Sequence, residues 1–103
     1  MQTDARDGPL QKTALHYAAV NGHDSVVHLL LDRGADRDAK EAYPSQKTAL
    51  HYAAENGHNS VVRLLLDDGV DRNFRDGFRR IAHDYAMIAM ERRNRFGLDG
   101  TAR

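Results

Sequence analysis

The feature that most constrains the fold is a seven-residue stretch, TALHYAA, that occurs at 13–19 and returns unchanged at 48–54. When residues 11–41 are compared with residues 46–76, 22 of the 31 positions are identical. A repeat of this period predicts stacked structural units, each of which buries its apolar face against its neighbours instead of in one central core. A chain of 103 residues has room for about three such units within one domain.

Each copy opens with the pattern of a short helix. Thr13 is a favoured N-cap, because its hydroxyl can accept a hydrogen bond from an unpaired backbone N–H of the first turn. Leu15, Ala18 and Ala19 then follow at helical spacing on one narrow face. Gly22 follows Asn21 and predicts the end of this helix. The same signals recur in the second copy.

A second helix is expected after that turn. Asp24 or Ser25 can cap it, and Val26, Leu29 and Leu30 repeat the helical spacing. Gly34 stands where this helix must stop. Because its apolar stripe is broad, we expect the second helix of each unit to be the more deeply buried one.

The repeats divide the chain into five segments. A third copy is recognisable when Tyr85 is aligned with Tyr52, but this puts Ile81 at the threonine position and Asp84 at the histidine position, so the capping pair is expected to be lost. One longer helix that ends at Gly97 is predicted there instead. The expected segments are an extended lead-in (1–12), a first unit (13–47), a second unit with its loop (48–80), a degenerate half-repeat or capping helix (81–96) and a tail (97–103).

Composition excludes several classes of function. The absence of cysteine rules out disulfides and thiolate chemistry. No apolar run approaches the roughly 20 residues of a membrane span, and no signal-peptide pattern opens the chain. We therefore expect an intracellular protein, cytoplasmic or nuclear, with no membrane association.

Charge is distributed unevenly along the chain although its net value is zero. Residues 1–71 contain 7 Lys and Arg against 11 Asp and Glu, whereas residues 72–103 contain 8 against 4. The basic C-terminal segment leaves nucleic-acid binding open as an alternative, but a clustered basic face with base-stacking groups would be needed. A solvated helix surface explains the same charges.

No constellation of catalytic or metal-binding residues stands out. His16 and His51 each follow a capping threonine by three residues, where an imidazole can return a hydrogen bond to the cap. Ser25 and Ser60 recur with the repeat at helix starts and lack the oriented base that a nucleophile requires. We therefore predict no enzyme activity, no cofactor and no metal site.

The repeated motifs resemble the ankyrin repeat: Thr-Ala-Leu-His-Tyr-Ala-Ala, Asn-Gly-His, Val-Val-x-Leu-Leu-Leu and Gly-Ala-Asp or Gly-Val-Asp. The resemblance covers about residues 4–90, with two well-matched repeats and a degenerate C-terminal half-repeat. It implies an all-α stack of helix-turn-helix units with hairpin-like finger loops, and it implies that His23 and His58 bond the loop backbone of adjoining repeats. The interval of 35 residues puts two extra residues into the finger around 41–46.

The resemblance also implies a protein-interaction module that binds a protein partner on its concave helix and finger surface. Carried over to this sequence, the implied contact residues are Tyr17, Val20, Asn21, Arg37, Tyr43, Tyr52, Glu55, Asn56, Arg72, Phe74 and Arg75, with Lys12, Lys40, Glu41 and Lys47 beside them. Asn73 occupies a finger position that an oxygenase can hydroxylate in the resembling family. Self-association through exposed repeat ends and a structural role within a longer array remain as alternatives.

Overall fold

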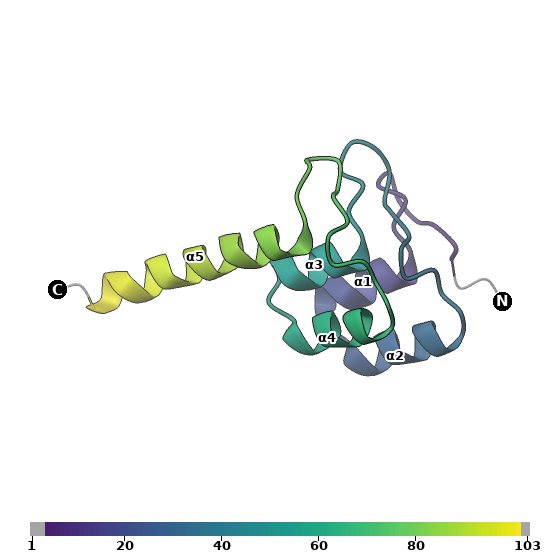
Figure 1. Ribbon diagram of the computed structural model, residues 1–103, viewed down its shortest axis with the longest axis horizontal. Helices are drawn as coiled ribbons and strands as arrows, with labels where there is room; N and C mark the ends of the chain where they lie inside the picture. The colour runs from purple at the N-terminus through teal and green to yellow at the C-terminus, as the bar shows by residue number, and fades with distance from the viewer. Residues whose placement is uncertain (1–3, 102–103) are drawn as a thin grey trace.

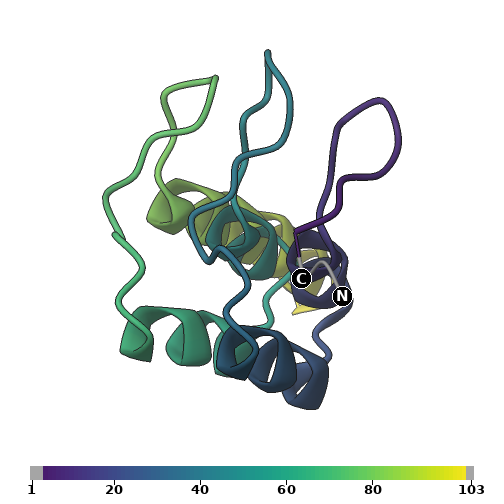
Figure 2. The same ribbon diagram turned by 90° about the vertical axis from the view of Figure 1, so that its right-hand side faces the viewer.

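The computed structural model describes residues 4–101, with side chains described as far as Arg92. The described residues form five helices and no named strand: α1 (Ala14–Asn21), α2 (Asp24–Asp32), α3 (Ala49–Glu55), α4 (Asn59–Asp67) and α5 (Ala82–Thr101). Helices α1, α3 and α5 lie in one row, and α2 and α4 lie in a second row against it (Figure 1). Three finger loops rise side by side from these rows (Figure 2). The predicted all-α repeat stack is therefore confirmed.

The first helix of each complete unit begins at a capping box. The Thr13 hydroxyl accepts from the His16 backbone N–H, and the Thr13 N–H donates to His16 Nδ1 at 3.0 Å. Thr48 and His51 repeat the arrangement in α3. Helices of seven to nine residues would be marginal in isolation, so these caps and the packing between units stabilise them.

The same histidines connect one unit to the next. Because Nδ1 accepts from the capping residue, the neutral ring carries its proton on Nε2. In His16 this nitrogen donates to the Lys47 carbonyl at 3.0 Å, and in His51 it donates to the Phe74 and Arg80 carbonyls, each at 3.0 Å. Burial lowers the pKa of both imidazoles and outweighs the opposite effect of these carbonyls. The histidines are thus neutral; their bonds to the caps were predicted from the sequence, whereas their links to the next unit were not.

The expected order of helix burial is wrong. Helix α1 buries Leu15, His16, Ala18 and Ala19, whereas α2 buries only Val27. The row of α1 and α3 lies between the fingers and the second row, so it is covered on more sides (Figure 2). Alanines on its inward face allow this close approach.

The two ends of the second row are less covered than its centre. Val26 in α2 is 42% exposed, whereas its repeat equivalent in α4, Val61, is fully buried because α2 packs on it. The next position shows the reverse order of burial: Val27 in α2 is fully buried, while its equivalent in α4, Val62, is only partly buried. Each unit therefore has an apolar side that only a neighbouring unit can cover.

The lead-in is not simply extended. Asp7 and Lys12 form an isolated antiparallel bridge, with backbone N–H to carbonyl distances of 2.8 and 3.0 Å. Residues 4–12 therefore form the first of the three fingers. The turn residues Gly8 and Pro9 reverse the chain between the bridged positions, which a search for helical periodicity could not reveal.

Helix α5 also differs from its expected form. It runs through Gly97 to Thr101, so the predicted end at Gly97 is wrong. Its start keeps half of the lost capping pair, because the Asp84 carboxylate accepts from the Ile81 backbone N–H at 2.9 Å. Aspartate in the histidine position thus replaces the imidazole acceptor. The expected side-chain caps of α2 and α4 are absent, since His23 and His58 occupy the N-cap positions without such a bond.

Backbone contacts join the fingers to one another. The Ala42 N–H donates to the Leu10 carbonyl at 2.7 Å, and the Gly77 N–H donates to the Ser45 carbonyl at 2.8 Å. A Cβ at Gly77 would lie 1.5 Å from the Pro44 carbonyl oxygen, so only glycine permits this approach. The fingers therefore form a continuous wall beside the first row of helices.

Candidate partner-binding surface

A row of alternating cations and tyrosines lies where the fingers meet the first row of helices. Its members come from two repeat positions, the last finger residue before the cap and the residue after the histidine position. The cations are Lys12, Lys47 and Arg80, and the rings are Tyr17, Tyr52 and Tyr85. We call the surface formed by these six residues the inner face.

The cations of the inner face bridge successive units. Lys12 Nζ lies 5.9 Å from the ring centroid of Tyr17 in its own unit and 4.4 Å from that of Tyr52 in the next. Lys47 Nζ likewise lies 5.1 Å from Tyr52 and 4.6 Å from Tyr85. Each such contact at a partly exposed site contributes about 0.5–1 kcal/mol. The contacts hold long side chains in defined positions across the three units.

Each tyrosine hydroxyl donates to a finger carboxylate. Tyr17 donates to Asp7 at 3.4 Å, Tyr52 donates to Glu41 at 2.6 Å, and Tyr85 donates to Asp76 in a short hydrogen bond. Burial, followed by these carboxylates, raises the pKa of Tyr52 and Tyr85 well above the usual range. The tyrosines therefore tie the fingers to the helices as neutral donors.

Glu41 is buried at the centre of this arrangement. Its Oε1 accepts from both Tyr52 and the Ser45 hydroxyl, each at 2.6 Å. Its Oε2 makes no hydrogen bond to a described residue, but Lys12 Nζ lies 3.8 Å away. The second finger thus brings a carboxylate under the cation row.

Asp76 is the repeat equivalent of Glu41 and is also buried. Its Oδ1 accepts from the Phe78 and Arg80 backbone N–H groups at 2.8 and 3.0 Å, and its Oδ2 accepts from Tyr85. Burial alone would raise the pKa of Asp76, but these three hydrogen bonds together lower it. The carboxylate is therefore ionised, with one oxygen bonded within the third finger and the other bonded to Tyr85 of α5.

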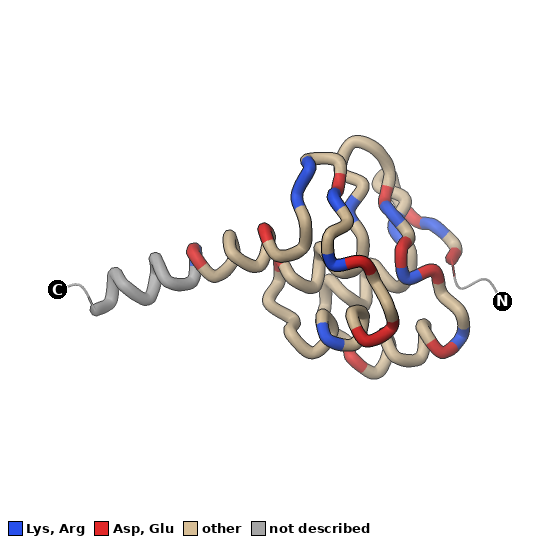
Figure 3. The backbone as a smooth tube through the Cα atoms, viewed as in Figure 1, with Lys and Arg blue, Asp and Glu red and all other residues tan. Residues whose placement is uncertain are grey.

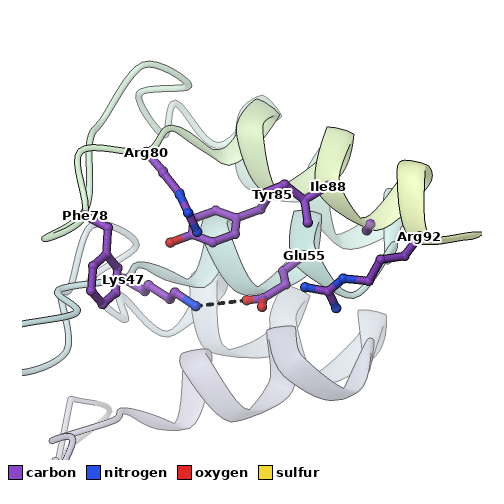
Figure 4. Close-up of a pocket in the computed structure, with 8 residues that line it drawn as sticks. Lys47, Glu55, Phe78, Arg80, Tyr85, Ile88 and Arg92 are labelled. Carbon is purple, nitrogen blue, oxygen red and sulfur yellow. Dashed lines mark hydrogen bonds and ion pairs between the residues drawn. The ribbon is translucent and has the colours of Figure 1, made fainter.

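At its C-terminal end the inner face opens into a small cavity of about 100 Å³ (Figure 4). Lys47 forms an ion pair with Glu55 at 3.0 Å on its floor. The Arg80 guanidinium lies 5.6 Å from the Tyr85 ring, and Arg92 reaches in from α5. The complete lining is Lys47, Glu55, Phe78, Arg80, Tyr85, Ile88, Ala89 and Arg92. Cations, an aromatic wall and an apolar wall meet in this cavity, which we call the basic pocket.

Charged residues gather on the fingers and turns, whereas α1 is free of them (Figure 3). Positive and negative side chains alternate along the fingers, and several of them pair with each other. Arg37, for example, lies 3.3 Å from Asp68. The described residues therefore present no uniformly basic surface of the kind that nucleic-acid binding requires.

The structure brings only part of the predicted contact set together. Tyr17, Tyr52 and Glu55 lie on or beside the inner face, and Lys12 and Lys47 join them. Tyr17 is exposed, but Tyr52 is half-buried and has two lysines, Lys12 and Lys47, near its ring. Tyr52 therefore positions its neighbours as much as it offers surface to a partner.

The other predicted contact residues are dispersed. Arg37 bridges to the turn after α4, and Phe74 packs against His51 with Lys40 above its ring. Arg72 and Asn73 line a separate groove beside α4 and α5. The remaining members are Tyr43 and Arg75 on the fingers, and Val20, Asn21 and Asn56 at the ends of α1 and α3.

One of those helix-end positions, Val20, takes part in a bond between units. The Val20 carbonyl accepts from His58 Nε2 at 2.9 Å, which confirms the bond between adjoining units that the resemblance implied for His58. A Cβ at Gly22 would lie 2.6 Å from the same ring, and Gly22 has a positive φ of 69°. For His23 the described residues provide no comparable bond. His58 can thus link two units because the unit before its own supplies the Val20 carbonyl.

Sequence reasoning missed the third-unit members of the inner face. The alignment that matches Tyr85 with Tyr52 also matches Arg80 with Lys47, and this signal was sufficient to find Arg80. The role of Asp76 follows from its repeat equivalence to Glu41 only once the Tyr52 contact is known. Phe78 and Arg92 have no repeat counterpart with the same role, so only the tertiary structure places them in the basic pocket.

The described part of the chain contains no group of three or more histidine, cysteine, aspartate or glutamate residues that could hold a metal ion. None of its helices combines the length and apolar character needed to cross a membrane.

Comparison with known proteins gives two findings. Residues 2–76 match a family described as "Ankyrin repeats (3 copies)", and this match ends before α5. A segment of 31 residues is 55% identical to the protein described as "Transient receptor potential cation channel subfamily A member 1 homolog" of Caenorhabditis elegans. That segment is 30% of this chain and 3% of the relative, so the similarity covers one short part of a much longer protein.

Proposed function

The chain belongs to the ankyrin repeat family, whose members are generally non-catalytic protein-interaction modules, and from this premise we propose that it binds a protein partner on its inner face. The observation that carries the proposal is the row of cations and tyrosines shared by three units. Aromatic and arginine side chains dominate the energy of protein interfaces. A binding module without enzyme activity is the function that this surface supports.

Preorganisation supports the same conclusion. Tyrosine hydroxyls bonded to the fingers and lysines placed over the rings lose little further conformational freedom when a partner binds. Tyr17 and Arg80 are exposed within this row and offer the contact surface. The exposed finger residues Tyr43 and Arg75 would extend contacts to a partner that follows the wall of fingers. We place such a partner in the cytoplasm or nucleus.

Affinity capture with matched surface variants tests the proposal. The whole chain, Tyr17→Ala and Arg63→Ala would each be immobilised and exposed to the same cell lysate, after circular dichroism has shown equal helix content. Arg63 is an exposed residue of α4, on the other row of helices, and serves as the control. We expect Tyr17→Ala to lose the captured protein and Arg63→Ala to retain it. Loss in the Arg63 variant alone would move the site to the second row.

Self-association is the second candidate, and the exposure of Val26 favours it. Val61, at the same repeat position, is fully buried by the preceding unit. The apolar surface around Val26 is therefore of the kind that another unit covers. A second copy could cover it. We expect Val26→Glu to abolish any dimer seen by sedimentation velocity, and a native chain that remains monomeric at high concentration would exclude this candidate.

A further inference from the structure

We propose that the basic pocket receives the carboxylate of an aspartate or glutamate side chain from a partner peptide, held by Arg80 and Arg92. The proposal deepens the proposed function and rests on it, because it supposes a protein partner on the inner face. It specifies the chemistry of that partner at one position.

The charges that line the pocket favour an anionic group. Three cations, Lys47, Arg80 and Arg92, come from the second finger, the third finger and α5, and Glu55 is the single carboxylate among the lining residues. Glu55 pairs with Lys47 at 3.0 Å, which leaves Arg80 and Arg92 without a carboxylate partner among the described residues. In Figure 4 the Arg92 side chain points across the pocket toward Glu55. The guanidinium groups of Arg80 and Arg92 can therefore bind a further carboxylate.

Two of the three cations, Lys47 and Arg80, are held in place before any ligand binds. Lys47 is held by Glu55 and lies 4.6 Å from the Tyr85 ring, and the Arg80 guanidinium lies 5.6 Å from the same ring. Tyr85 is itself fixed by its bond to Asp76. Guanidinium groups bind carboxylates through two parallel hydrogen bonds, which are strongest when the donor is already oriented.

The size and walls of the pocket fit one side chain of a peptide. Its volume of about 100 Å³ is well below the roughly 300–1,000 Å³ of small-molecule sites. Phe78 is exposed at the rim, and Ile88 and Ala89 provide an apolar wall. An acidic residue beside an apolar residue in the partner would place the carboxylate on the cations and the apolar group against Phe78.

A nucleic acid fits this surface less well. Glu55 stands inside the pocket, and the buried carboxylates Glu41 and Asp76 lie under the same row of tyrosines. A polyanion that followed the inner face would meet these negative charges as well as the cations, whereas a peptide with one or two acidic residues would meet only the pocket. The balance of charge therefore favours the peptide.

A selection from defined peptides tests the proposal with the whole chain. A phage-displayed library of random twelve-residue peptides would be selected on the protein, and the recovered consensus peptide would be synthesised with a fluorescent label in two forms. The first retains its acidic residue, and the second has the corresponding amide. We expect acidic residues to be enriched, and fluorescence anisotropy to show about tenfold weaker binding of the amide form, as for a lost charge-assisted hydrogen bond.

Variants assign the effect to the pocket. Arg92→Gln should weaken binding of the acidic peptide about fivefold to tenfold and leave the amide form unchanged, whereas Arg63→Gln on α4 should change neither. Arg92→Glu should in turn prefer a peptide with lysine at the acidic position. These exposed substitutions avoid the buried core, and circular dichroism would verify the fold.

The outcomes separate this proposal from the wider function. Peptides that bind equally well as acid and amide, or binding that Arg92→Gln does not change, would overturn the acidic pocket but leave the interaction module intact. A library that yields no binder of any composition would count against both.

A labelled single-stranded oligonucleotide of twenty thymidines provides the last comparison. If the oligonucleotide bound more tightly than the peptide, and if Arg92→Gln weakened its binding, the pocket would be a phosphate-binding site and the proposal would fail.

Discussion

Removing the hydroxyl of each inner-face tyrosine in turn should reveal how unequally the three units depend on the same contact. The variants Tyr17→Phe, Tyr52→Phe and Tyr85→Phe each delete one oxygen from an otherwise unchanged ring. The three hydroxyls donate to carboxylates whose burial and remaining partners differ. The structure therefore predicts a ranked series of losses in the free energy of unfolding.

The largest loss is expected for Tyr85→Phe. Tyr85 is 3% exposed and Asp76 is 6% exposed, and the hydroxyl is the hydrogen-bond donor that the structure gives to Asp76 Oδ2. Its removal leaves a buried charged oxygen without that donor, which costs about 2–3 kcal/mol. For Tyr52→Phe we expect about 1 kcal/mol, because Glu41 Oε1 keeps the Ser45 hydroxyl as a second donor.

Tyr17→Phe should leave stability unchanged, because Tyr17 and Asp7 are exposed and their contact is 3.4 Å long. Urea denaturation followed by far-ultraviolet circular dichroism would measure all three variants in parallel. Tyr43→Phe, on a residue that is 83% exposed, provides the control for the substitution itself. A loss in Tyr17→Phe as large as that in Tyr85→Phe, or three losses of equal size, would refute the reasoning from burial.

Three further predictions follow from single features of the fold. Gly77→Ala should cost about 1–3 kcal/mol, measured by the same denaturation assay, because the new Cβ meets a backbone oxygen of the neighbouring finger; an unchanged midpoint would show that the fingers separate freely. Burial lowers the pKa of His16 and His51 from 6.5, so the unfolded chain binds protons more readily; stability should be complete above about pH 6.5 and should decline as the pH falls below it. Urea midpoints that do not change between pH 7.5 and pH 5.5 would contradict this. Asn73 is exposed, with its backbone N–H bonded to Asp71, and incubation with an asparaginyl oxygenase should add one oxygen by mass; no added mass would remove it as a modification site.

Much of the fold could be predicted from the sequence because its determinants are local. The cap Thr13, the imidazole three residues later and the glycine after Asn21 fix the first helix within about ten residues, and the second copy at Thr48 repeats them. The family match confirms what the period implied. The end of α5 could not be predicted in this way, because a glycine inside a helix is tolerated at a modest cost and does not by itself stop the helix.

Less of the candidate site was predictable, and Tyr52 shows why. The family resemblance implies only that Tyr52 is a contact residue of the concave surface. A half-buried ring results because the second finger brings Glu41 to its hydroxyl and because Lys12 of the preceding unit reaches its face. Both partners are distant in sequence, and no local pattern encodes their approach.

The sequence by itself therefore determined the repeat unit, its caps and the row of equivalent positions that carries cations and tyrosines, since these depend on spacing along the chain. Only the tertiary structure decided which members of that row are buried and which are open. The stacking of units covers Val61 but leaves its equivalent Val26 exposed. Helix α5 forms without a histidine at its cap and brings Arg92 to the basic pocket. Identical residues acquire different roles because burial depends on which neighbouring unit packs against them.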